Sequence, residues 1–286
     1  MTPSAYHVKY PEKHRSCVVF ASPHSGRNYG DSFLQRSVLD RRAIRSSEDA
    51  FVDRLFEAAS QHGAMLLCAD VPRAFVDLNR STDELDPALI QGVRRQGHNP
   101  RVASGLGVIP RVVANGRAIY RGKLTLTEAQ ARIDDYWIPY HNMLQLLLDR
   151  THRRHGQSVL IDCHSMPHEA IDGMARGGMP APHIVLGDRF GATCGAEIVD
   201  QIETAFTAAG FIVARNTPFA GAFITQSYGR PSRRQHAVQV EIDRSLYMDE
   251  ATIAPNADFA AVQQALSVAI KDIARIGPVQ MPLAAE

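Results

Sequence analysis

Apolar and polar residues alternate along this chain in a pattern that predicts strands and helices in turn. Short apolar runs at 17–21 and 158–161 are typical of buried strands. Apolar residues at three- and four-residue spacing predict helices over 51–59 and 125–154, and Pro139 is expected to kink or split the second. This alternation over the whole length predicts a three-layer α/β sandwich, with a mixed, largely parallel sheet between layers of helices.

Chemically versatile side chains stand at the ends of three strand-like runs. His24, His164 and Glu241 each belong to such a run. Because the carboxyl ends of parallel strands meet at one edge of a sheet, we expect these side chains to lie close together. A carboxylate in an otherwise apolar strand is either paired or functional. Glu241 is therefore a candidate general base, with a salt bridge to Arg244 or another arginine as the alternative.

The histidines suggest a metal site. Zinc hydrolases hold the metal with three side chains, usually histidines or carboxylates, and use a further carboxylate as the base. His24 and His164 are candidate ligands, although a single histidine is more often a hydrogen-bonded core residue. The third ligand is expected from Asp49 or Glu48 at the start of the next predicted helix, where the alternative is helix capping. His168 forms an H-x-x-x-H pair with His164, but the proline between them argues against a helix there, so we expect it outside the metal shell.

Two arginines flank a strand-like segment of mixed character. Arg73 and Arg80 lie seven residues apart, with Asp77 and Asn79 between them. A guanidinium group binds a carboxylate through two parallel hydrogen bonds and stabilises a developing oxyanion. Exposed arginine is the ordinary alternative, but the polar neighbours in a semi-buried strand favour a function in the site.

The length and composition predict one domain with a long loop. The chain has 286 residues, of which 45% are apolar, and no change in composition marks a linker. We therefore expect a single domain spanning residues 1–286. The segment at about 82–122 contains many glycines and prolines and lacks periodicity, which is typical of a functional loop or lid.

The net charge and the cysteine pattern indicate which kinds of ligand and which cellular compartment to expect. The 31 Lys and Arg residues balance 30 Asp and Glu residues, giving a net charge of +1, which argues against nucleic acid or an anionic membrane and favours a small-molecule substrate. The four cysteines are far apart, which predicts a reducing compartment. The absence of a signal-peptide pattern and of an apolar run of membrane-spanning length predicts a cytoplasmic protein.

Four segments together resemble a known family. They are 22–26 (Ser-Pro-His-Ser-Gly), 77–80 (Asp-Leu-Asn-Arg), 162–167 (Asp-Cys-His-Ser-Met-Pro) and 241–249, which begins Glu-Ile-Asp-Arg. In this order they resemble the N-formylglutamate amidohydrolase family. The resemblance implies a fold like that of zinc carboxypeptidases and aspartoacylases. It also implies hydrolysis of N-formyl-L-glutamate to formate and L-glutamate, a step in histidine degradation.

The resemblance implies functions for individual residues of the metal centre. The implied Zn²⁺ ligands and general base are His24, His164 and Glu241. Related families place the acidic ligand three residues after the first histidine, where this chain has Arg27. The third ligand must therefore come from later in the chain, and Asp49 is expected ahead of Glu48.

The resemblance also implies a substrate-binding set. Asn79 and Arg80 match an Asn-Arg pair that holds a substrate carboxylate in aspartoacylases. Arg73 falls where those relatives place an arginine that polarises the scissile carbonyl group. Tyr228, shortly before the Glu241 strand, is expected to line the substrate pocket.

Two alternative functions remain open at this point. The same metal site would serve a deacylase of another N-acyl amino acid or of a short peptide, and the segment at 82–122 gives no sign of the specificity. A metal-free amino-acid-binding module would keep the fold. That alternative gives no reason to combine His24 and His164 with Glu241.

Overall fold

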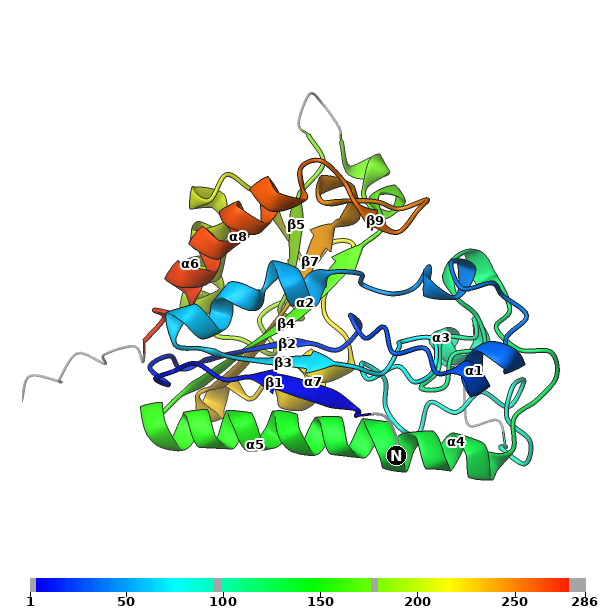
Figure 1. Cartoon of the computed structure of the whole chain (residues 1–286). Helices are drawn as coiled ribbons and strands as arrows, with labels where there is room; N and C mark the ends of the chain where they lie inside the picture. The colour runs from blue at the N-terminus through cyan, green and yellow to red at the C-terminus, as the bar shows by residue number, and fades with distance from the viewer. Residues whose placement is uncertain (1–3, 95–98, 176–179, 278–286) are drawn as a thin grey trace, which may run out of the picture.

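A seven-stranded mixed sheet forms the centre of the computed structural model, which describes residues 4–94, 99–175 and 180–277 (Figure 1). The strand order is β1-β3-β2-β4-β7-β5-β6. Only the β1–β3 and β5–β7 pairings in this described sheet are antiparallel, which confirms a mixed, largely parallel sheet. The strands are β1 Tyr6–Lys9, β2 Val18–Ser22, β3 Met65–Ala69, β4 Ser158–Met166, β5 Ile184–Gly187, β6 Val213–Arg215 and β7 Gln235–Asp243, and a separate hairpin pairs β8 Met248–Asp249 with β9 Ala254–Pro255.

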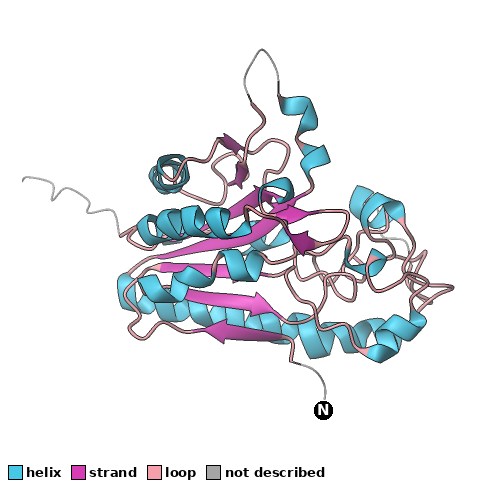
Figure 2. Cartoon of the chain, turned by 45° about the horizontal axis from the view of Figure 1, so that its top comes forward, coloured by secondary structure: helices cyan, strands magenta, loops and turns pink. Residues whose placement is uncertain are grey.

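Helices cover both faces of the sheet, so the predicted three layers are confirmed (Figures 1 and 2). Helices α2, α6 and α8 pack on one face, and α4, α5 and α7 pack on the other. The α-helices are α1 Asp31–Arg36, α2 Val52–Leu55, α3 Pro100–Ala103, α4 Leu126–Arg132, α5 Ile138–His155, α6 Ala196–Ala208, α7 Phe223–Tyr228 and α8 Phe259–Ile273. The predicted helix over 51–59 is in fact α2 followed by the 3₁₀ helix Glu57–His62.

Side chains of the central strands alternate between the two faces. On β4, Val159 and Ile161 belong to the core beneath α2, α6 and α8, whereas Leu160 belongs to the core beneath α5. Residues at even positions of β4 therefore share the face that carries α5 and α7. His164 lies at such a position, near the end of the strand.

The long helical segment contains a π-helical turn before Pro139. Helix α4 leads into the π-helix Ile133–Trp137, and α5 follows directly from Ile138. Pro139 thus falls in the first turn of α5. The helical backbone continues through all three segments, so the missing N–H of Pro139 would interrupt an α-helical hydrogen bond, and the split predicted at Pro139 takes the form of a local π turn just before it.

The segment 73–80 is not a strand, which corrects the strand-like interpretation of its sequence. The backbone N–H groups of Phe75 and Val76 both donate to the carbonyl oxygen of Pro72, and the N–H of Asn79 donates to the Asp77 carboxylate. These local hydrogen bonds replace pairing with a neighbouring strand. An apolar run that ends in polar groups suggests a strand here, but the backbone forms consecutive turns.

The long segment at 82–122 packs against the helical layer, and its residues 95–98 lie outside the described part. The described portion contains only α3 and a short 3₁₀ turn as helices. Several of its apolar side chains, among them Val108, Ile109 and Ile119, are fully buried in the same core as α5. The described portion is therefore anchored by its own apolar residues.

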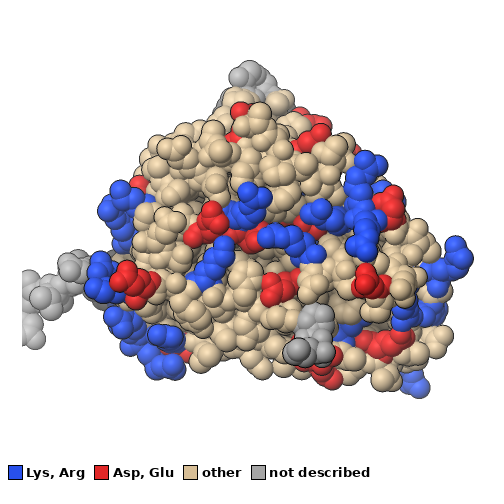
Figure 3. Space-filling view, viewed as in Figure 1, with Lys and Arg blue, Asp and Glu red and all other residues tan. Residues whose placement is uncertain are grey.

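Basic and acidic side chains are interspersed over the face shown in Figure 3. Several charged side chains of the described residues form ion pairs, for example Arg27 with Asp53 at 3.1 Å. This mixture agrees with the near-zero net charge of the sequence. Within the described ranges, no helix combines the length and apolar character needed to cross a bilayer.

A buried histidine joins α5 to the turns at 73–80. The Nε2 atom of His141 lies 2.8 Å from the carbonyl oxygen of Leu78, and Nδ1 lies 2.8 Å from the hydroxyl oxygen of Tyr228. Because a carbonyl oxygen only accepts, Nε2 carries the proton and Nδ1 accepts from Tyr228. Burial lowers the pKa of His141 to about 4.

This histidine predicts a loss of stability at mildly acidic pH. Between about pH 6.5 and 4 the unfolded chain takes up a proton at His141 and the folded protein does not, so stability falls as the pH falls, by up to about 1.4 kcal/mol per pH unit. Urea unfolding of the wild type and of a His141→Gln variant across this range measures the effect. We expect a shallower pH dependence in the variant, and equal slopes would contradict the assignment.

Candidate metal centre and active-site cavity

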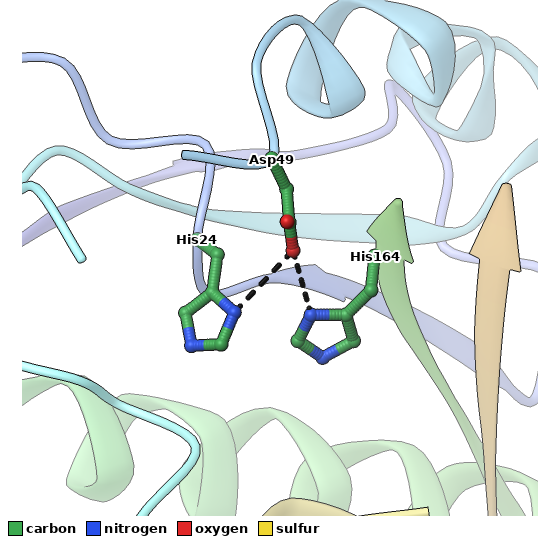
Figure 4. A group of neighbouring side chains, drawn as sticks. All are labelled: His24, Asp49 and His164. Carbon is green, nitrogen blue, oxygen red and sulfur yellow. Dashed lines mark hydrogen bonds and ion pairs between the residues drawn. The ribbon is translucent and has the colours of Figure 1, made fainter. Parts of the chain in front are cut away.

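Two histidines and an aspartate converge at the carboxyl edge of the sheet (Figure 4). His24 follows β2, Asp49 precedes α2, and His164 lies near the end of β4. All three are buried, and one candidate ligand atom from each lies within 4.8 Å of the other two. The Nδ1 atoms of His24 and His164 lie 3.3 and 2.9 Å from Oδ2 of Asp49. The structure therefore brings together the three predicted metal ligands.

Local backbone contacts fix the loops that carry His24 and Asp49. The backbone N–H of Asp49 donates to the carbonyl oxygen of His24, at 3.0 Å. Two residues after His24, Gly26 passes so close to Val71 that an added Cβ would lie 2.0 Å from its carbonyl oxygen. Only glycine permits this approach, which explains the glycine of the Ser-Pro-His-Ser-Gly segment.

The outer nitrogen of each imidazole ring faces a carboxylate. The Nε2 atom of His24 lies 2.7 Å from Asp77, and Nε2 of His164 lies 3.1 Å from Asp162. For His24, a protonated Nε2 that donates to Asp77 leaves the Nδ1 lone pair directed at the centre of the cluster, the usual arrangement of metal-binding histidines. The Nδ1 atom of His24 is buried without a hydrogen-bond partner among the described residues. Two imidazole nitrogens and a carboxylate oxygen are a suitable donor set for a divalent metal ion.

The charges around the cluster favour a bound cation. Burial would raise the pKa of Asp49, but the hydrogen bond from His164 and the nearby charge of His24 hold that pKa well below its usual range. Burial acts against a charged His164, yet Asp162 raises the pKa of His164 well above its usual range. Positive charge is therefore stabilised where the two imidazole rings meet Asp49.

Arginines hold the second oxygen of Asp49. Nη2 of Arg244 lies 2.9 Å from Oδ1 of Asp49, and Nη1 of Arg73 lies 3.8 Å from the same atom. Arg73 also donates to Asp77 from Nε. One oxygen of Asp49 therefore faces the histidines, while the other is fixed from the opposite side.

Glu241 lies beside this cluster on β7. Its backbone pairs with that of His164 in the β4–β7 register. The amide of Gln239 donates to Oε1 of Glu241, and the backbone N–H of Ala222 donates to the amide oxygen of Gln239. Burial raises the pKa of Glu241 to about 7. No ion pair of Glu241 occurs among the described residues, so the salt bridge to Arg244 considered from the sequence is not formed.

A cavity of about 580 Å³ opens above the cluster. The predicted site residues that line it are His24, Asp49, Arg73, Asn79, Arg80, His164 and Glu241. The amide oxygen of Asn79 accepts from the backbone N–H of Ile224, and its nitrogen lies 3.0 Å from Nε2 of His164. Asn79 thus lines the cavity and also lies in contact with His164, one of the candidate metal ligands.

Three other candidates lie elsewhere. Glu48 pairs with Arg45, so Asp49 takes the position beside the histidines. His168 pairs with an aspartate outside the cluster, as expected. Tyr228 does not line the cavity, contrary to its predicted position, because its hydroxyl group is directed to the buried His141.

The sequence pattern did not identify several residues that lie in the site. Asp162 and Gln239 each lie two positions before a predicted site residue on the same face of its strand, and this period of two could have identified them. For Arg244, the sequence suggests only a salt bridge to Glu241. Its contact with Asp49 joins residues 195 positions apart, for which the sequence holds no local signal.

Comparison with known proteins decides the family. Residues 16–248 match the family model described as N-formylglutamate amidohydrolase. The chain belongs to the N-formylglutamate amidohydrolase family. It is 31% identical over 258 residues to a relative from Pseudomonas aeruginosa named N-formylglutamate deformylase, covering 87% of this chain and 89% of that protein. A Pseudomonas putida relative of the same name is 28% identical and covers 82% of each chain.

A solved structure supports the membership of this family. The crystal structure of an N-formylglutamate amidohydrolase from Ralstonia eutropha superposes with a TM-score of 0.88 at 35% identity, covering 95% of this chain and 98% of the other. A gene product of Agrobacterium tumefaciens shares the fold, with a TM-score of 0.63 at 16% identity, covering 95% of this chain and 96% of the other. The resemblance noted in the sequence is therefore confirmed at the level of the family.

The contact between His24 and Asp77 generates a prediction about metal affinity. An Asp77→Asn variant loses the charge that orients the His24 ring, so we expect it to bind Zn²⁺ about 10–100-fold more weakly, as measured by competition with a chromophoric chelator. Asp86→Asn is the matched control, because Asp86 is equally buried and pairs with Arg111 outside the cluster. Unchanged affinity in Asp77→Asn would contradict this arrangement.

Proposed function

We propose that this protein is a metal-dependent amidohydrolase that hydrolyses N-formyl-L-glutamate to formate and L-glutamate, with Zn²⁺ as its metal ion. The observation that carries the proposal is the buried cluster of His24, Asp49 and His164, beside Glu241 in one cavity. The relatives from Pseudomonas are named for this reaction. The metal would supply a Lewis acid that polarises the formyl carbonyl group and lowers the pKa of water.

Glu241 is the proposed general base. Its carboxylate accepts a proton from the attacking water molecule and delivers it to the nitrogen of the departing amino acid. A pKa of about 7 suits both transfers. Gln239 holds the carboxylate in position through the hydrogen bond to Oε1.

The proposed substrate-binding groups are arginines with fixed orientations. Arg73, held by Asp77 and the carbonyl oxygen of Ser47, stabilises the negative charge that develops on the formyl oxygen. Arg80, beside Asn79, binds the α-carboxylate of the substrate and so places the amide for attack. Tyr228 acts at most indirectly, through His141.

A reducing, cytoplasmic location is part of the proposal, and the state of the cysteines supports it. All four are buried as free thiols, with no disulfide among them. Burial raises the pKa of Cys17 to about 11 and that of Cys68 to about 12. Buried thiols that stay protonated are unreactive, which supports a structural function for them.

Metal removal tests the chemistry. Treatment with a chelator is expected to lower formate release from N-formyl-L-glutamate at least about 100-fold, because the Lewis acid is lost, and added Zn²⁺ is expected to restore it. Full activity after metal analysis has verified removal would contradict the proposal.

A substrate panel accompanies this assay and separates the alternatives. We expect hydrolysis of N-formyl-L-glutamate in preference to its N-acetyl and N-succinyl counterparts. Preference for another acyl group would favour a deacylase on the same metal site. Tight binding of an amino acid by purified protein without metal or turnover would favour the binding module.

A Glu241→Gln variant tests the base. The amide keeps the size of the side chain but cannot accept the proton, so we expect kcat to fall by about 10²–10⁴-fold with metal content unchanged. Asp243→Asn is the matched control on the same strand face, since Asp243 contacts His168 and Ser245 instead of the cluster. An active Glu241→Gln enzyme would remove the base assignment.

A further inference from the structure

Four arginines line the cavity, and two of them lack a carboxylate partner. Arg73 and Arg244 lie within ion-pair distance of Asp49. Arg80 and Arg101 have no carboxylate at that distance among the described residues. Arg80 is buried, whereas Arg101 is exposed at the wall of the cavity. Two guanidinium groups of the cavity lining therefore form no ion pair with the described residues.

One short segment connects these two arginines. Arg101 lies on α3, and its carbonyl oxygen accepts from the backbone N–H of Leu106. The carbonyl oxygen of Leu106 accepts in turn from Nε of Arg80, whose Nη1 donates to the carbonyl oxygen of Asn79. These contacts fix the guanidinium of Arg80 and place the helix that carries Arg101 next to it.

The two positive charges act on each other. Burial lowers the pKa of Arg80, and the charges of Arg73 and Arg101 lower it further, against the opposite effect of Asp77. Like charges in one cavity repel, and a bound anion relieves that repulsion. A ligand with two carboxylates neutralises both groups at once.

The proposed substrate carries two carboxylates at different distances from the amide. The α-carboxylate is attached to the carbon that bears the amide nitrogen, so it must bind close to the reacting centre, where the buried Arg80 lies beside Asn79. The side-chain carboxylate is two methylene groups further from the amide, so it can reach a second guanidinium group of the lining, such as that of Arg101 at the wall. We propose that Arg101 binds this second carboxylate and thereby selects acidic N-formyl amino acids, an inference that rests on the proposed function.

The experiment compares two substrates that differ only in this group. N-formyl-L-glutamate and N-formyl-L-glutamine have similar shape, but the second has a neutral side chain. An Arg101→Gln variant is expected to lose about 10–100-fold in kcat/KM on N-formyl-L-glutamate, mainly through KM, and to change little on N-formyl-L-glutamine. Arg101→Lys should recover part of the loss. Arg121→Gln, an exposed arginine that does not line the cavity, is the matched control and should match the wild type.

The outcomes separate this inference from the proposed function. A loss confined to the acidic substrate supports it. Equal losses on the two substrates, or no loss, would overturn it while leaving the hydrolysis of N-formyl-L-glutamate by the wild type intact. A wild type that hydrolyses neither substrate, with its metal bound, would overturn the proposed function and the inference together.

Discussion

The site depends on one buried carboxylate. Asp49 presents Oδ2 to the imidazole rings of His24 and His164 and Oδ1 to Arg244, so elements from four parts of the chain meet at one side chain. Removing one partner of a buried ion pair typically costs about 3–5 kcal/mol, because the remaining charge is left uncompensated. Electrostatic contacts, as well as packing, therefore fix the relative positions of the strand ends, the loop after β2 and the start of α2.

The sheet positions His164 and Glu241, and the surrounding segments hold the polar groups next to them. β4 and β7 lie in parallel register and place His164 opposite Glu241, with their apolar neighbours turned to the other face. Two contacts link this arrangement to the helical layer. The backbone N–H of Ile224 holds Asn79, and His141 holds the carbonyl oxygen of Leu78. The orientation of the polar groups is thus supported by the core beneath α5.

The sequence predicted the strands that carry the chemistry better than the loops that complete it. Strand periodicity and the position of polar residues at strand ends identified His24, His164 and Glu241, since both signals are local. Adjacent carboxylates in a loop share the same local signal, so spacing could not separate Asp49 from its neighbour. The turns at 73–80 have the sequence of a short strand, an apolar run that ends in polar residues, but most of their hydrogen bonds are local, which the sequence pattern does not reveal.

The position of the segment at 82–122 affects how substrate specificity can evolve in a protein of this fold. Its described part forms a wall of the cavity, yet several of its apolar residues pack in the core beneath α5 and not at the sheet edge that carries the candidate metal ligands. Substitutions, insertions or deletions there can reshape the wall while the strand ends stay in place. Changes in this one segment can therefore alter the substrate preference while the residues proposed to carry out the hydrolysis stay the same.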